Sequence, residues 1–130
     1  MTPAEARAAT LTRFVSEWAN RTPIDHDADN RGTPNAPYIR IVMRHEGGIR
    51  FTTSENQRFG LVFIQVFVQG GRGTAESDAL SYAAARILES STIGIIRFGA
   101  AEIRDVGQDE EGSGLRMTVI TIPFEYEDVV

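Results

Sequence analysis

Hydrophobic residues at helical spacing open the chain and predict a first helix. Four of them fall three or four residues apart, on one helical face: Leu11, Phe14, Val15 and Trp18. Thr2 and Glu5 have the spacing of a capping box, and Pro3 suits the first helical position. Because Pro23 cannot continue a helix, we expect this one to end at residues 20–22.

A polar loop and a hairpin are predicted next. Residues 23–37 are rich in Asp, Asn, Gly and Pro, and this length makes the loop a candidate for function. Residues 38–45 alternate between apolar and polar, which is typical of a half-buried strand. Glu46-Gly47-Gly48 is expected to turn the chain into a second strand at 49–53.

The middle of the chain predicts a central strand followed by a second helix. Residues 59–68 are apolar on both faces, so we expect this strand to lie inside the sheet with cover on both sides. Gly70–Gly73 is a glycine-rich turn, and Thr74 is placed to cap the helix that follows. The buried stripe of that helix is predicted to be Leu80, Ala83, Ala84, Ile87 and Leu88.

Three more strands complete the pattern. Residues 93–98 and 101–106 are expected to be joined by a tight turn at Gly99, and 115–124 follows an acidic loop at 107–114. The predicted order is αβββαβββ. We therefore expect an α+β fold, in which two helices pack on a mixed, mostly antiparallel β-sheet.

Composition restricts the possible functions. With 130 residues and 42% hydrophobic positions, the chain suits a single domain over 1–130. It has no cysteine, which excludes disulfides, thiolate metal sites and a thiol nucleophile. No signal peptide is visible, and the longest apolar run, Leu61–Val68, is far shorter than the roughly 20 residues of a membrane span. We expect a soluble protein made in the cytoplasm.

The net charge of −5 argues against the basic patch that duplex DNA binding requires. It is compatible with a channel that conducts DNA, because such a channel works better if it repels phosphate. Two acidic clusters contribute to this charge, Asp109-Glu110-Glu111 and Glu125, Glu127 and Asp128. They form either a solvated rim or a negative wall that faces DNA or docks a basic partner.

The polar loop holds the candidate metal ligands. Asp25, Asp27 and Asp29 alternate as at the start of a calcium loop. The twelfth position, which should supply a bidentate acid, is Ala36, and the sixth is Asn30 rather than glycine. A solvated loop is the better interpretation, and no metal or cofactor is predicted.

The candidate catalytic residues also fail to form a complete site. His26 beside Asp27 could form an acid–base pair, which makes a small hydrolytic enzyme using loop 24–37 the alternative of another class. Adjacent residues rarely point at the same atom, however, and no nucleophile context accompanies them. The glycines of 70–73 lack the lysine and spacing of a P-loop, so a strand-to-helix turn explains them.

An ordered set of short segments resembles the tail terminator family of long-tailed double-stranded DNA phages. The set covers nearly the whole chain: Trp18, Thr22-Pro23, Pro37-Tyr38-Ile39-Arg40, Arg58-Phe59-Gly60, Val68-Gln69-Gly70-Gly71-Arg72-Gly73 and Ile122-Pro123-Phe124-Glu125-Tyr126. The resemblance implies a non-enzymatic virion protein of a phage, prophage or gene transfer agent. Such a protein forms a hexameric ring that caps the tail tube at its head-proximal end, having come from the host cytoplasm.

The same resemblance implies the partners. They are other copies of the chain, the tail tube protein and a head-completion or stopper protein, while DNA passes through without specific binding. A ring of this kind stops tube polymerisation and offers a joining surface to the head. Another head–tail connector or tail-tube component is the alternative within the same class.

A ring closes when a heterologous interface repeats around an axis, and unpaired sheet edges invite such contacts. Arg40 and Arg44 project from the non-core face of their strand, so we expect them to meet acids of the next subunit. Further candidate interface residues are Arg50, Arg58 and Arg72. Candidate lumen or rim acids are Asp109, Glu110, Glu111, Glu125 and Glu127.

Overall fold

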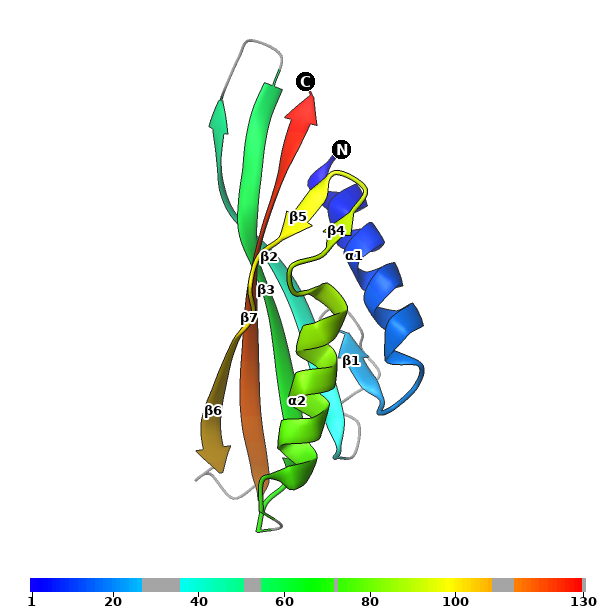
Figure 1. Ribbon diagram of the computed structural model, residues 1–130, viewed down its shortest axis with the longest axis vertical. Coiled ribbons are helices and arrows are strands. Elements are labelled where there is room, and N and C mark those ends of the chain that lie inside the picture. The colour runs from blue at the N-terminus through cyan, green and yellow to red at the C-terminus, as the bar shows by residue number, and fades with distance from the viewer. Residues whose placement is uncertain (27–35, 51–54, 72, 109–113, 130) are drawn as a thin grey trace.

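Two helices cover one side of a seven-stranded sheet (Figure 1). The computed structural model describes residues 1–26, 36–50, 55–71, 73–108 and 114–129. In chain order the elements are α1 (Pro3–Trp18), β1 (Ile24–His26), β2 (Tyr38–Arg50), β3 (Glu55–Gln69), α2 (Ala75–Leu88), β4 (Thr92–Ile93), β5 (Ile96–Phe98), β6 (Glu102–Gln108) and β7 (Leu115–Val129). The predicted α+β class, with a mostly antiparallel sheet and two helices, is confirmed.

Helix α1 begins where the sequence predicts but ends at Trp18, earlier than the expected end at residues 20–22. The Thr2 hydroxyl accepts a hydrogen bond from the Glu5 amide at 3.2 Å, and the Glu5 carboxylate accepts one from the Thr2 amide at 3.1 Å. This reciprocal capping box satisfies two amides that the helix itself leaves free. At the other end Ala19 adopts a left-handed conformation, with φ of 55°, and stops the helix.

The sheet is organised around β3. The strand order is β1-β2-β3-β7-β5-β4, with β6 also pairing with β7. Strand β3 pairs antiparallel with β2 on one side and with β7 on the other, over its whole length on the β7 side. The prediction that this strand lies centrally is therefore confirmed. Strand β1 pairs parallel with β2, and β5 and β6 each pair with a different part of β7.

The core lies between the helices and one face of the sheet. Alternate residues of β2, β3 and β7 point toward the helices and are buried: Ile39, Ile41, Met43, Val62, Ile64, Val66, Val68, Ile120, Ile122, Phe124 and Tyr126. The helices supply Phe14 and Trp18, whose rings stack 5.6 Å apart, together with Ala84, Ala85 and Leu88. One layer of helix on one layer of sheet buries a single core.

The expected turn at Glu46-Gly47-Gly48 is wrong. Strand β2 continues to Arg50, and the register with β3 shifts between His45 and Gly47. A β-bulge takes up the extra residue there, so the strand bends and continues to pair. The predicted strands 38–45 and 49–53 therefore belong largely to one strand, and the connection 51–54 lies outside the described residues.

The later strands also differ from the prediction. Gly94, with φ of 59°, divides the expected strand 93–98 into β4 and β5. Strand β5 does not continue as a hairpin into β6, because Phe98 pairs with Phe124 while β6 pairs farther along β7. Strand β7 runs past Phe124 to Val129, and β1 lies within the predicted polar loop.

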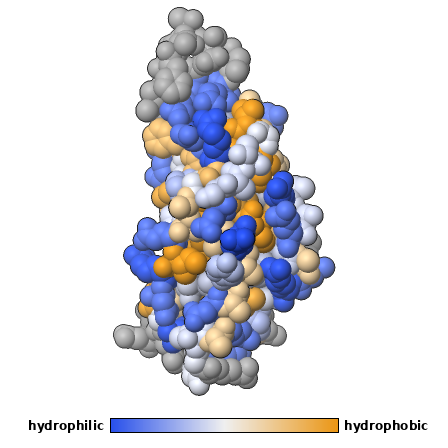
Figure 2. Space-filling view, in the orientation of Figure 1, coloured by the Kyte–Doolittle hydropathy of each residue, from blue (hydrophilic) through white to orange (hydrophobic). Residues whose placement is uncertain are grey.

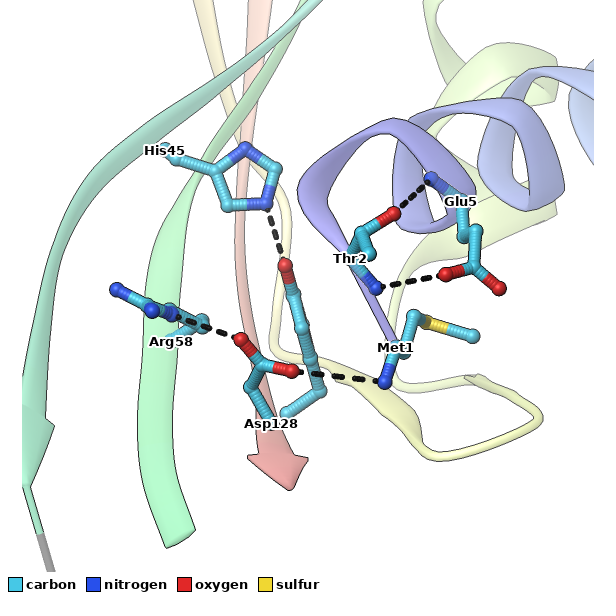
Figure 3. A network of polar contacts seen from close by, with 7 residues as sticks. Met1, Thr2, Glu5, His45, Arg58 and Asp128 are labelled. Carbon is cyan, nitrogen blue, oxygen red and sulfur yellow. Dashed lines mark hydrogen bonds and ion pairs between the residues drawn. The ribbon is translucent and has the colours of Figure 1, made fainter. Parts of the chain in front are cut away.

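A polar network ties the beginning of the chain to the end of β7 (Figure 3). The Asp128 carboxylate lies 3.5 Å from the Met1 ammonium and accepts a 3.3 Å hydrogen bond from Nε of Arg58. Beside it, Nε2 of His45 lies 2.8 Å from the Tyr126 hydroxyl. Burial lowers the pKa of His45, and the nearby charges of Arg7 and Arg58 lower it further.

We expect Gly60→Ala to destabilise the fold. A Cβ at residue 60 would lie 1.9 Å from the Arg44 carbonyl oxygen, so the two strands would have to separate beside the bulge. Overpacking of this kind costs about 2 kcal/mol or more in free energy of unfolding, measurable by urea denaturation. Gly47→Ala is the matched control, because its Cβ meets only the end of the Phe59 ring at 3.2 Å. Equal stability of the two variants would contradict the close approach.

We expect His45 to make stability depend on pH. Its folded pKa lies below its unfolded value, so the unfolded chain binds the proton more readily and stability falls as the pH drops through about 6.5. His45→Gln should flatten this part of the curve of unfolding free energy against pH. His26→Gln is the control for the other histidine. An unchanged slope in His45→Gln would show that the neutral, buried state of this ring is wrongly assigned.

Candidate subunit interface

The face of the sheet opposite the helices has no cover within the described chain. Side chains of β3 alternate, so Val62, Ile64 and Val66 are fully buried under the helices while Phe63 and Phe67 point the other way. Phe63 and Phe67 are only half-buried. Within the residues that the structure describes, the expected cover on the second side of this strand is thus absent. We call this second side the uncovered face.

A groove of about 400 Å³ crosses the uncovered face. Its walls come from three neighbouring strands: Arg40, Val42 and Arg44 of β2, Phe63 and Gln65 of β3, and Val119 of β7. The strand register places these residues side by side, because Val42 pairs with Phe63 and Gln65 pairs with Val119. The groove therefore has an apolar floor and a basic side.

Each groove arginine lies over an aromatic ring. The Arg40 guanidinium is 5.5 Å from the centre of Phe67, and that of Arg44 is 5.7 Å from the centre of Phe63. Tyr38 stacks on the same Phe67, with ring centres 4.7 Å apart, and its burial raises the pKa of its hydroxyl. Stacking of this kind holds the flat guanidinium groups in place.

The two groove arginines differ in their partners. Arg40 donates to one oxygen of Asp25 from Nε at 3.0 Å and from Nη2 at 2.8 Å, which fastens β1 to β2. Arg44 is exposed, and no described carboxylate pairs with it. Arg40 is therefore already neutralised inside the chain. Of the two predicted contacts, Arg44 is the cation left available to a partner.

A second hollow, of about 570 Å³, lies farther along the uncovered face between β3, β5 and β7. Phe59, Leu61 and Pro123 line it, and Arg97 and Glu125 stand at its rim. Arg97 binds Glu125 at 3.3 Å and Glu127 at 2.8 Å, which raises its own pKa and lowers that of Glu127. The charges at this end are thus paired with one another.

The remaining predicted residues have different positions. Arg58 lies on the helix side, where it binds Asp128, and so it is not part of the uncovered face. Glu125 and Glu127 belong to β7 and are not a free tail. Other predicted residues or their side chains lie outside the described residues: His26, Asp27, Asp29, Arg50, Arg72, Asp109, Glu110 and Glu111.

Strand β6 offers another exposed surface. Ile103 and Val106 are about half exposed, at 48% and 50%. Figure 2 shows a hydrophobic patch among hydrophilic residues on the left of the view, at the height of β6 in Figure 1. In the described chain the outer edge of this strand pairs with nothing. It is a second place where another chain could attach.

The sequence indicated that this face of β3 is apolar but did not indicate that the described chain leaves it without cover. The signal was present, because residues 59–68 are apolar at both odd and even positions. The second side of such a strand is covered either by another layer of the same chain or by another molecule. Here both helices lie on the first side, so they do not form that second layer. In the described residues no three acidic or histidine side chains gather as metal ligands, and neither helix has the length and apolarity of a membrane span.

Two solved structures share this fold over almost the whole chain. One, known only by a sequence identifier, is 18% identical, has a TM-score of 0.67 and aligns over 97% of this chain and 96% of its own. The other is a chain in the virion of a native gene transfer agent particle. It is 15% identical, has a TM-score of 0.64 and aligns over 93% of both chains. No family model and no curated protein matches the sequence. The likeness establishes the fold that these chains share.

Proposed function

We propose that the chain is a structural protein of a phage-type virion and acts as a tail terminator. In this role it closes into a ring, caps the tail tube at its head-proximal end, stops tube polymerisation and joins the tail to the head. DNA passes through the ring. The observation that carries the proposal is the fold shared with a chain of a gene transfer agent virion over 93% of both chains.

The shape of the surface supports an assembly role. A terminator must bind copies of itself and a tube, so it needs faces that are apolar enough to bind and are not used by its own core. The uncovered face meets this need, since Phe63, Val42 and Val119 form an apolar floor that the helices do not reach. Apolar surface that the protein's own core does not use often marks the place where another molecule binds.

The charges are compatible with the same role. The chain has a net charge of −5, and Arg40, Arg58, Arg97 and Arg116 are each paired with a carboxylate of the same chain. Such a surface does not hold DNA phosphates and lets them move past. In this role the protein works by assembling with other proteins and catalyses no reaction. Its partners are the tail tube protein and a head-completion protein.

We expect the purified chain to form a closed ring of six copies, either alone or on addition of tail tubes. Light scattering after size-exclusion chromatography measures the mass of the particle, and electron microscopy of the tubes shows whether a ring caps one end. Loss of the gene should give tails of uncontrolled length or heads without tails. A chain that stays single in the presence of tubes, together with normal tails in its absence, would contradict the proposal.

A further inference from the structure

The outward side of α2 carries an exposed tyrosine next to an acid. Tyr82 is 61% exposed, the largest value among the exposed large hydrophobic residues of the described chain. Asp78 lies one helical turn before it and is also exposed. Ala75 and Ala79 lie on the same outward stripe, and Arg86, one turn after Tyr82, has its guanidinium 5.7 Å from the centre of the Tyr82 ring. Asp78, Tyr82 and these two alanines are called the helix stripe below.

The helix stripe points away from the sheet. Ser77, Ser81, Ala84, Ala85 and Leu88 are the buried residues of α2, and they face the sheet. The stripe is on the opposite side of the helix, and Figure 1 shows both helices on the same side of the sheet. The groove on the uncovered face and the helix stripe therefore lie on opposite sides of the molecule.

The groove and the stripe carry opposite charges at Arg44 and Asp78. The groove offers an apolar floor at Val42, Phe63 and Val119, beside the guanidinium of Arg44 that no described carboxylate pairs with. The stripe offers a tyrosine ring one turn from the carboxylate of Asp78, for which no described ion pair exists either. Tyrosine gives much contact area at little entropic cost and is enriched at the centres of interfaces.

We propose that the occupant of the groove is a second copy of this chain, with its helix stripe docked so that Tyr82 covers the apolar floor and Asp78 binds Arg44. This inference rests on the proposed function, because it assumes that copies of the chain join. It adds which two surfaces meet. Arg44 is the arginine that binds, while Arg40 remains with Asp25 of its own chain.

Docking of this kind is head-to-tail. The two surfaces are different and lie on opposite sides, so each copy has one free groove and one free stripe after every addition. A heterologous contact that repeats with a constant rotation closes into a ring when the rotation allows it. Two copies related by a two-fold axis would have to make this contact twice, so that each groove receives the stripe of the other copy. The groove and the stripe lie on opposite sides of the molecule, which prevents this.

Charge exchange tests the contact between residues 44 and 78. Arg44→Asp alone places two acids together at every joint, and Asp78→Arg alone places two arginines together. Each variant should raise the concentration at which half the chains are assembled by more than about thirtyfold. Mixed in equal amounts, the two variants should assemble again, because every joint in an alternating ring then holds one aspartate and one arginine.

Tyr82→Ala tests the apolar part of the contact and should weaken assembly to a similar degree. Matched controls are Val15→Ala, which removes an exposed apolar side chain from α1, and Arg21→Asp, which reverses an arginine that lies over the Trp18 ring. Both controls should assemble like the unsubstituted chain. All the changed side chains are exposed, so the free energy of unfolding of each variant should stay within about 0.5 kcal/mol of the original, as urea denaturation can verify.

The outcomes separate this inference from the proposed function. Unimpaired assembly of Arg44→Asp, Asp78→Arg and Tyr82→Ala would overturn the docking contact and leave the ring intact. Failure of the mixed charge variants to recover would also overturn it. Failure of the unsubstituted chain to assemble, with and without tail tubes, would overturn both.

Discussion

Two helices can cover only one face of this sheet, and the rest of the structure depends on that constraint. Strand β3 (Glu55–Gln69) is apolar on both faces and is paired on both sides, so its backbone is satisfied inside the chain. Its side chains, by contrast, are fully buried on one face only. Val62, Ile64 and Val66 lie under the helices, while Phe63 and Phe67 form part of a face that another molecule must cover if their apolar area is to leave water.

This division explains why the polar interactions are placed as they are. On the helix side the network of Met1, Arg58 and Asp128 holds the chain start against β7, and the half-buried ring of His45 lies beside Tyr126. On the uncovered face the arginines lie over aromatic rings and do not cross to the core. The core side is thus closed by contacts between residues far apart in the sequence.

The sequence predicted those elements whose signals are local. The capping box of Thr2 and Glu5 is confirmed, and it starts α1 by contacts within a few residues. Of the predicted apolar stripe, Phe14 and Trp18 are buried, whereas Val15 is 41% exposed. Gly47 and Gly48 predicted a turn, but pairing with β3 on one side outweighed the local preference and produced a bulge. Whether the turn or the strand forms depends on pairing with a partner strand, and the sequence of one segment does not show that pairing.

The candidate site was predictable only in part, for the same reason. Alternation in 38–45 correctly placed Arg40 and Arg44 off the core, but the Asp25 that neutralises Arg40 comes from a strand that the sequence presented as loop. Glu125 and Glu127 looked like a free acidic tail because their cation, Arg97, belongs to another strand. Charge patterns along a chain give the sign of a surface, whereas the pairing across strands decides which charges remain free.

Strand β1 has a consequence for the behaviour of the protein in storage. Its three residues cover the edge of β2 at Ile39–Ile41, and the bond between Asp25 and Arg40 holds them there. Without β1, the backbone amides of β2 at these positions would be open to strands of unfolded or neighbouring molecules, which is how cross-β aggregates start. Conditions that weaken a salt bridge, such as strong acid, therefore favour precipitation at this edge of the sheet before the core itself opens.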